Sequence, residues 1–153
     1  MSRMVNGEIH TNWNGEDRTD YLFRISLKAL IYNDEGQILV VKEHGLNWGL
    51  PGGGMDHGET FESALARELY EEVGYQGKFT FDVIDTADPM HLTKANIWQV
   101  WVVCHVVPET FDFSVGPDAE DMKFIDPSEL ESSEDTQAVY AMKYHSRHQA
   151  RKR

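Results

Sequence analysis

The chain has 153 residues, of which 41% are hydrophobic and 26% are charged, proportions that are typical of one globular domain. Its formal net charge of −12 disfavours non-specific contacts with nucleic acid or with an anionic membrane surface, so neither is expected as a partner. The single cysteine, Cys104, excludes an internal disulfide and indicates a reducing cytoplasm, and no apolar stretch is long enough to span a membrane.

The first part of the sequence predicts a polar arm followed by two strands. Residues 1–20 are rich in Asn, Gly, Asp and Glu, which indicates a loosely held arm ahead of a domain that spans 21–153. The segment 23–32 is rich in strand-forming residues, and Asn-Asp-Glu-Gly at 33–36 is a turn signal. Residues 37–42 are therefore expected to form the returning strand.

A short amphipathic helix is predicted at 60–73, after a glycine-rich loop at 43–54. Thr60 is a favourable N-cap, and Gly74 is a typical helix stop. Aliphatic residues recur at i, i+4 and i+8 and form one apolar stripe: Leu65, Leu69 and Val73. The helix is therefore expected to bury this stripe.

The rest of the chain predicts strands that alternate with helices. The expected elements are strands at 78–86, 97–107 and 122–125, a helical turn at 126–130 and a final helix at about 135–148. The strand at 97–107 is apolar on both faces, as a central strand should be. The segments 87–96 and 108–119 are polar or acidic connections. This order indicates an α/β or α+β fold with a mixed sheet.

Between Gly53 and Gly74 the sequence follows the pattern G-x5-E-x7-R-E-L-x-E-E-x-G. Its charged members are four glutamates and one arginine: Glu59, Arg67, Glu68, Glu71 and Glu72. A helix advances about 100° per residue, so Glu71 and Glu72 lie within about 60° of Glu68 and share one face with it. Their repulsion costs roughly a few tenths of a kcal/mol per pair, and divalent cations would offset it. A solvated acidic helix face is the alternative interpretation.

Together with the Leu-Pro-Gly-Gly-Gly in front of it, this segment resembles the signature of the Nudix hydrolases. It departs from that signature only at its last position, where Tyr75 replaces the usual aliphatic residue, a difference that concerns packing. The resemblance extends over most of residues 22–131. It implies an α/β/α sandwich with a mixed β-sheet, and Mg²⁺-dependent cleavage of a phosphoanhydride bond in a nucleoside diphosphate-linked substrate, with Mn²⁺ as a substitute ion.

The resemblance also implies a set of metal ligands. The set consists of one backbone carbonyl and four carboxylates: Gly52, Glu59, Glu68, Glu71 and Glu72. Glu68 and Glu72 are the principal ligands, while Glu71 is either a third ligand or the group that positions the attacking water. Arg67 is expected to orient a glutamate through a bidentate pair, and contact with phosphate is the alternative.

The general base and the substrate contacts are expected to come from segments that border the cleft. Glu120, in a loop near the last strand, is the candidate base, and Asp118 is its rival. The candidate substrate contacts are Arg24, Lys42, Trp48 and Gly53. No Gly-Lys-Ser/Thr follows the glycine-rich loop, so a P-loop of the nucleotide triphosphatases is not supported.

The substrate and the assembly stay open at this stage. Nucleoside triphosphates, oxidised nucleotides and ADP-ribose are the leading candidates, and dinucleoside polyphosphates come next. A non-catalytic nucleotide sensor with the same fold is the alternative function, although the retention of every glutamate in the pattern argues against it. Members of this family are frequently dimers, which makes a homodimer a candidate assembly.

Overall fold

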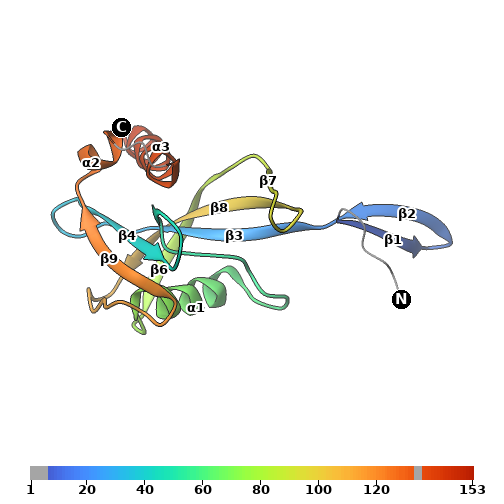
Figure 1. Ribbon diagram of the computed structural model, residues 1–153, viewed down its shortest axis with the longest axis horizontal. Helices are drawn as coiled ribbons and strands as arrows, with labels where there is room; N and C mark the ends of the chain where they lie inside the picture. The colour runs from blue at the N-terminus through green and yellow to red at the C-terminus, as the bar shows by residue number, and fades with distance from the viewer. Residues whose placement is uncertain (1–6, 133–135) are drawn as a thin grey trace.

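The computed structural model describes residues 7–132 and 136–153 of the chain. The β-sheets lie between helix α1 (Phe61–Val73) on one side and helices α2 (Pro127–Glu131) and α3 (Thr136–Arg151) on the other (Figure 1). The larger sheet contains both parallel and antiparallel pairs of strands. The α/β/α sandwich with a mixed β-sheet that the resemblance implies is therefore confirmed.

The larger sheet is built around β8 (Ile97–Pro108), the strand predicted to be central. β3 (Phe23–Leu30) pairs with it in parallel, and β6 (Phe79–Thr86) pairs with it in antiparallel orientation. β7 (Met90–Leu92) also pairs with β8, so the segment 87–96, predicted to be a polar connection, contains a strand that was not predicted. The cause is a tight turn before β8, in which the chain reverses direction and returns beside itself.

The smaller sheet has the order β5–β4–β9 and is antiparallel throughout. It consists of β5 (Trp48–Gly49), β4 (Ile38–Glu43) and β9 (Ala119–Ile125). β4 returns after the turn at 33–36 as predicted, but it meets the end of β3 only near that turn and then pairs with β9. β9 begins earlier than the predicted 122–125 because it pairs along the whole of β4.

The glycine-rich loop runs along the edge of β3 like an additional strand. The amides of Leu27 and Ala29 donate to the carbonyls of Gly53 (2.9 Å) and Pro51 (2.8 Å). Gly52 lies between these two contacts with a φ of 137°, and a Cβ atom there would lie 1.9 Å from the Leu27 carbonyl oxygen. Only glycine fits this approach, so the sequence brings the Gly52 backbone close to β3, in front of α1.

The apolar core has one part on each side of the larger sheet. The predicted apolar stripe of α1 is fully buried against one face. On the other face α3 buries Ala141 and Tyr144 beside Trp101 and Leu30. Cys104 is buried on the α1 side, and this burial raises the pKa of its thiol to about 11, as expected of a small core residue.

The N-terminal segment is more ordered than the predicted loosely held arm. β1 (Glu8–Trp13) and β2 (Glu16–Tyr21) form a hairpin that projects away from the helices (Figure 1). Asn14 and Gly15 take positive φ values of 54° and 84°, which is the geometry of a two-residue hairpin turn. Residues 1–6 of the predicted arm lie outside the described residues.

The C-terminal helices follow the prediction closely. Asp126 caps α2 through its side chain, and a proline occupies the first turn. α3 extends to Arg151, beyond the predicted end at 148, and the predicted start at 135 lies outside the described residues. None of the helices within 7–132 and 136–153 combines the length and the apolar character needed to cross a membrane.

Candidate functional site

Helix α1 is fixed at both ends by its own caps. Thr60 Oγ1 accepts a hydrogen bond from the Ser63 amide (3.1 Å), and Ser63 Oγ accepts one from the Thr60 amide (2.9 Å). Gly74 has a φ of 60°, and its amide donates to the Tyr70 carbonyl (3.1 Å). The helix predicted at 60–73 is confirmed, and its caps fix which residues face the sheet.

Tyr75, the departure from the family signature, anchors the end of this helix. Its ring is 2% exposed and packs against Phe113 at a centroid distance of 5.0 Å. Its hydroxyl donates to the Lys78 carbonyl (2.6 Å) and accepts from the Glu109 amide (3.2 Å). The larger residue thus fills the core and satisfies backbone groups that an aliphatic side chain would leave without a partner.

The glutamates at 68, 71 and 72, here called the glutamate cluster, lie against the glycine-rich loop. Glu68 is 8% exposed and Glu72 is 2% exposed. Glu72 Oε2 accepts a hydrogen bond from the Gly52 amide (3.2 Å). Burial raises the pKa of Glu72, the neighbouring Glu43 carboxylate raises it further, and Lys28 acts in the opposite direction. The helix therefore keeps acidic groups where apolar side chains would be more stable.

Arg67 contacts several acidic groups around the cleft at once. It forms a bidentate pair with Glu59, with Nε 2.6 Å from Oε1 and Nη2 3.0 Å from Oε2. Its Nη1 donates to Glu68 (2.8 Å) and to Glu71 (3.2 Å), and its Nη2 donates to the Gly54 carbonyl (3.0 Å). The guanidinium lowers the pKa of Glu59 to about 2. Arg67 thus links the start of the helix to the glutamate cluster.

The glycines after Gly52 leave space for charged side chains. A Cβ atom at Gly53 would lie 2.6 Å from Glu68 Oε1, and one at Gly54 would lie 2.3 Å from Arg24 Nη2. These positions accept no larger residue without moving a carboxylate or a guanidinium. The bare backbone of the loop therefore forms one wall of a cleft.

This cleft has a volume of about 420 Å³, which is within the usual range for small-molecule sites. Its lining combines the cluster with loop residues and one arginine: Arg24, Glu43, His44, Gly53, Gly54, Glu68, Glu71, Glu72 and Asp118. The sequence analysis missed Glu43 and His44. They stand at the end of β4, and only the pairing of β4 with β9 brings that end to the glutamate cluster.

Several predicted residues lie outside the cleft lining. Glu120 pairs instead with Lys42 (Nζ to Oε2, 3.4 Å) and His44 (Nδ1 to Oε1, 3.5 Å), while its rival Asp118 lines the cleft. Trp48 is half-buried, and Lys123 Nζ lies 4.3 Å from the centroid of its ring. Glu59 faces Arg67, as described above.

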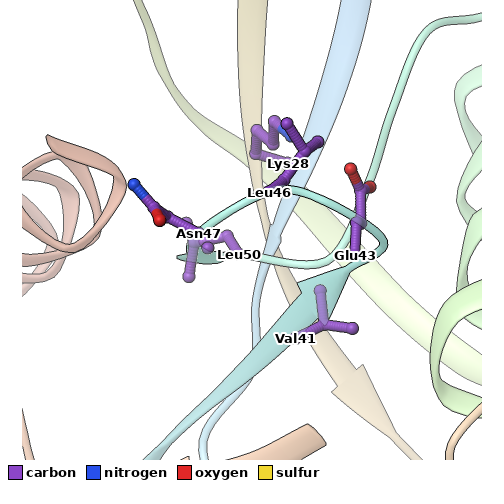
Figure 2. A pocket seen from close by; sticks show the side chains of 7 residues that line it. Lys28, Val41, Glu43, Leu46, Asn47 and Leu50 are labelled. Carbon is purple, nitrogen blue, oxygen red and sulfur yellow. The ribbon is translucent and has the colours of Figure 1, made fainter. Parts of the chain in front are cut away.

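A second, smaller pocket of about 200 Å³ (Figure 2) shares Glu43 with the cleft. Its lining is part apolar and part polar: Lys28, Val41, Glu43, Leu46, Asn47, Gly49 and Leu50. Lys28 Nζ lies 3.5 Å from the Gly52 carbonyl oxygen and 5.1 Å from the centroid of the Trp101 ring. We name this space the Lys28 pocket.

The oxygen atoms in and beside the cleft fit a hard divalent cation. Such ions prefer carboxylate and carbonyl oxygens, which Glu72, Glu68 and the Gly52 backbone supply. Over the described ranges, no set of three acidic, histidine or cysteine side chains already surrounds a common metal position. Glu68 accepts a hydrogen bond from Arg67, and the Gly52 carbonyl accepts one from Lys28. A bound metal ion would replace these cationic partners.

Comparison with known proteins gives one family match that covers most of the chain. A model of the NUDIX domain matches residues 22–145. The chain is 46% identical over 57 residues to an RNA pyrophosphohydrolase of Vibrio atlanticus, a match that covers 37% of this chain and 33% of that relative. The chain therefore spans about a third of the length of the curated relatives that it matches.

Solved structures share the fold. The MutT protein from Methanosarcina mazei superposes with a TM-score of 0.71 at 20% identity, over 86% of this chain and 96% of that one. The NUDIX domain of Shewanella oneidensis NrtR, solved with ADP ribose, superposes with a TM-score of 0.64 at 18% identity, over 83% and 88% of the two chains. At such identities the likeness concerns the fold alone.

Proposed function

Because the chain belongs to the Nudix family, we propose that it is a divalent-cation-dependent pyrophosphohydrolase that cleaves a phosphoanhydride bond in a nucleoside diphosphate-linked substrate. One observation supports this most strongly: Glu68 and Glu72 are buried in a cleft of about 420 Å³, beside a loop of bare glycine backbone. Buried carboxylates cost stability unless cations bind them. A metal site that binds phosphate groups would explain why the two carboxylates are buried there.

Glu68, Glu72 and the Gly52 carbonyl would hold Mg²⁺, with Mn²⁺ as a substitute. When bound, the ion neutralises phosphate oxygens and lowers the pKa of a coordinated water. Glu71 lines the cleft with 31% of its side chain exposed, so it would accept the proton of the attacking water. The water oxygen forms a bond to phosphorus as the bridging P–O bond breaks. Arg24 would bind a phosphate oxygen.

The general base has a second candidate on the other side of the cleft. Asp118 lines the cleft, so it would reach a water there without rearrangement. Glu120 would first have to leave Lys42 and His44, and the hydrogen bond from Lys42 lowers the pKa of Glu120, which weakens it as a base. We therefore rank Glu71 and Asp118 above Glu120.

The substrate classes that we propose share a nucleoside diphosphate unit. They are nucleoside triphosphates, oxidised nucleotides and ADP-ribose. The 5′-triphosphate end of RNA joins them because the curated relatives are named RNA pyrophosphohydrolases. This addition differs from the expectation, based on a net charge of −12, that nucleic acid is not a partner.

Hydrolysis assays with Mg²⁺ or Mn²⁺ over these four substrate classes test the proposal. We expect turnover of at least one class, loss of turnover with EDTA, and products identified by mass as a nucleoside monophosphate or RNA 5′-monophosphate plus the leaving group. Tight nucleotide binding without turnover would instead favour the non-catalytic sensor. In labelled water, the product that gains the heavy oxygen identifies the phosphorus that is attacked.

We further propose a cytoplasmic homodimer. The single, buried cysteine suits a reducing compartment. The projecting β1–β2 hairpin leaves Trp13 and Tyr21 exposed at 68% and 61%, a surface that a second copy would cover. Light scattering of the full chain and of the Trp13→Ala variant tests the assembly, and a monomeric wild type at micromolar concentration would contradict it.

A further inference from the structure

The Lys28 pocket lies next to the proposed metal ligands, and its lining holds one lysine and one glutamate, whereas acidic side chains outnumber the single arginine in the cleft. Lys28 Nζ is 3.5 Å from the Gly52 carbonyl oxygen, and the Gly52 amide is 3.2 Å from Glu72. Glu43 lines both spaces. A diphosphate that touches metal ions at the glutamate cluster would therefore have its next group within reach of the Lys28 pocket.

Lys28 is a half-buried cation that is available to an anion. It forms none of the ion pairs found in the described part of the chain. Its amino group donates to the Gly52 carbonyl and faces the Trp101 ring, and its charge also acts on the Glu72 carboxyl. Asn47, on the rim of the same pocket, adds an amide that donates hydrogen bonds. Glu43 is the acidic group of this lining, and it lies against Glu72, so cations at the glutamate cluster would offset its charge as well.

The size of the pocket limits what can enter it. Its volume of about 200 Å³ is roughly that of seven waters and lies below the usual range for whole ligands. A phosphate group takes up only a small part of such a space, whereas a phosphoribose would take up most of it and a second nucleoside all of it. Val41 and Leu50 are buried, so the pocket cannot widen on their side without a change in the core, whereas Leu46, which also lines it, is exposed.

We propose that the Lys28 pocket receives the terminal phosphate of the substrate, so that the chain prefers substrates whose diphosphate ends in free phosphate over those that carry a large group at both ends. The preferred class is nucleoside or RNA 5′-triphosphates, and the disfavoured class is ADP-ribose and dinucleoside polyphosphates. Water adds across the cleaved P–O–P link, and the leaving phosphate or pyrophosphate departs from the Lys28 side. This inference rests on the proposed hydrolase function.

The first test compares substrates that share one nucleoside. We expect kcat/KM for ATP and for a 5′-triphosphorylated RNA that begins with adenosine to exceed that for ADP-ribose and for diadenosine tetraphosphate by at least about tenfold, which is 1.4 kcal/mol in transition-state binding. Equal or faster cleavage of ADP-ribose would overturn the inference while leaving the hydrolase function intact.

The second test removes the amino group and keeps the length of the side chain. Lys28→Met should weaken the binding of inorganic pyrophosphate, measured by calorimetry with Ca²⁺, by roughly ten- to a hundredfold, and should raise KM for ATP more than it lowers kcat. Lys28→Arg should recover most of this binding. Lys143→Met, at an exposed position on α3, is the matched control and should bind pyrophosphate like the wild type.

The binding assay separates failure of the inference from failure of the proposed function. If no substrate is hydrolysed, the hydrolase proposal falls, but the effect of Lys28→Met on pyrophosphate binding still tests the pocket. Unchanged binding in Lys28→Met, with a circular dichroism spectrum and melting temperature like those of Lys143→Met, would overturn the assignment of Lys28. If Lys28→Met does not fold, Lys28→Gln takes its place in the same comparison.

Discussion

Helices α1 and α3 cover opposite faces of the same sheet, but they bury different kinds of side chain. α3 buries Ala141, Tyr144 and one imidazole, that of His148. α1 buries Leu65 and Leu69 together with two carboxylates, those of Glu68 and Glu72. Replacing buried charges by apolar groups commonly stabilises a protein. The acidic side of α1 thus gives up stability at the place where we propose a binding site, whereas α3 buries no carboxylate.

The largest expected effect separates activity from stability on α1. Glu72→Gln removes a proposed metal ligand, so kcat/KM should fall by about a thousandfold. The free energy of unfolding in urea should not fall, because the variant no longer buries an acidic group whose pKa is raised. Glu62→Gln, at an exposed position in the first turn, is the control: it should leave kcat/KM unchanged and lower the free energy of unfolding by less than about 1 kcal/mol, the contribution of an acidic group near a helix N-terminus. Near-normal activity of Glu72→Gln would contradict the assignment.

The reverse separation is expected on α3. Tyr144 is 0% exposed, and Tyr144→Ala should lower the free energy of unfolding by about 3 to 5 kcal/mol because it opens a cavity. At a temperature where the variant remains folded, kcat/KM should change less than about threefold. Urea unfolding and a hydrolysis assay on one preparation measure both. A large loss of kcat in folded protein would mean that α3 contributes to the cleft.

A moderate effect is expected at the residue that organises the acidic cluster. Arg67→Lys keeps the charge but loses the bidentate pair with Glu59 and at least one of the contacts to Glu68 and Glu71. We expect kcat to fall by roughly ten- to a hundredfold and the concentration of Mg²⁺ needed for half-maximal activity to change with it. If this variant has the kinetics of the wild type, the contacts of Arg67 with the glutamates do not position any group that catalysis requires.

The smallest effect is a dependence on pH confined to the α3 side. Three imidazoles lie together there: His105, His145 and His148. Burial lowers the pKa of each imidazole and Lys152 adds to this, while Asp82 acts in the opposite direction on His105. The unfolded chain then takes up protons first, so stability is full above about pH 6.5 and falls as the pH drops below it.

Urea unfolding at pH 7.5 and pH 5.5 measures this loss. We expect His148→Phe to lose less stability than the wild type between the two values, by under about 1 kcal/mol because the group is partly screened. Identical losses in the two proteins would contradict the role of the imidazole cluster. Fluorescence and circular dichroism should give the same midpoints, as two-state unfolding requires.

The local signals in the sequence were sufficient for α1 and for part of the site. The spacing from Gly53 to Gly74 sets the caps, the apolar stripe and the shared face of the glutamates, because all of these depend on helix geometry alone. Tyr75 was expected to matter only for packing, and its ring is buried in the core. The Asn14-Gly15 dipeptide is also a local signal, because it is typical of a two-residue hairpin turn. The sequence analysis nevertheless predicted a loosely held arm at this place.

Long-range pairing decides the rest of the site. Glu43 and His44 reach the cleft because β4 pairs with β9, and Lys28 reaches Gly52 because the loop lies along β3. The spacing of residues within one segment cannot predict these contacts, because they join segments that are far apart in the sequence. The direction of Glu120 also depends on a neighbouring strand, through its pair with Lys42.

The glycine-rich loop limits how the proposed cleft could adapt to a diphosphate. Two amides of β3, those of Leu27 and Ala29, donate hydrogen bonds to the loop on both sides of Gly52. Gly52 itself has no room to move toward that strand. A segment tied into a sheet in this way does not swing like a lid. Adaptation to an incoming diphosphate must then come from side chains that change partners, Arg67 and Lys28 first among them, over a backbone that stays still.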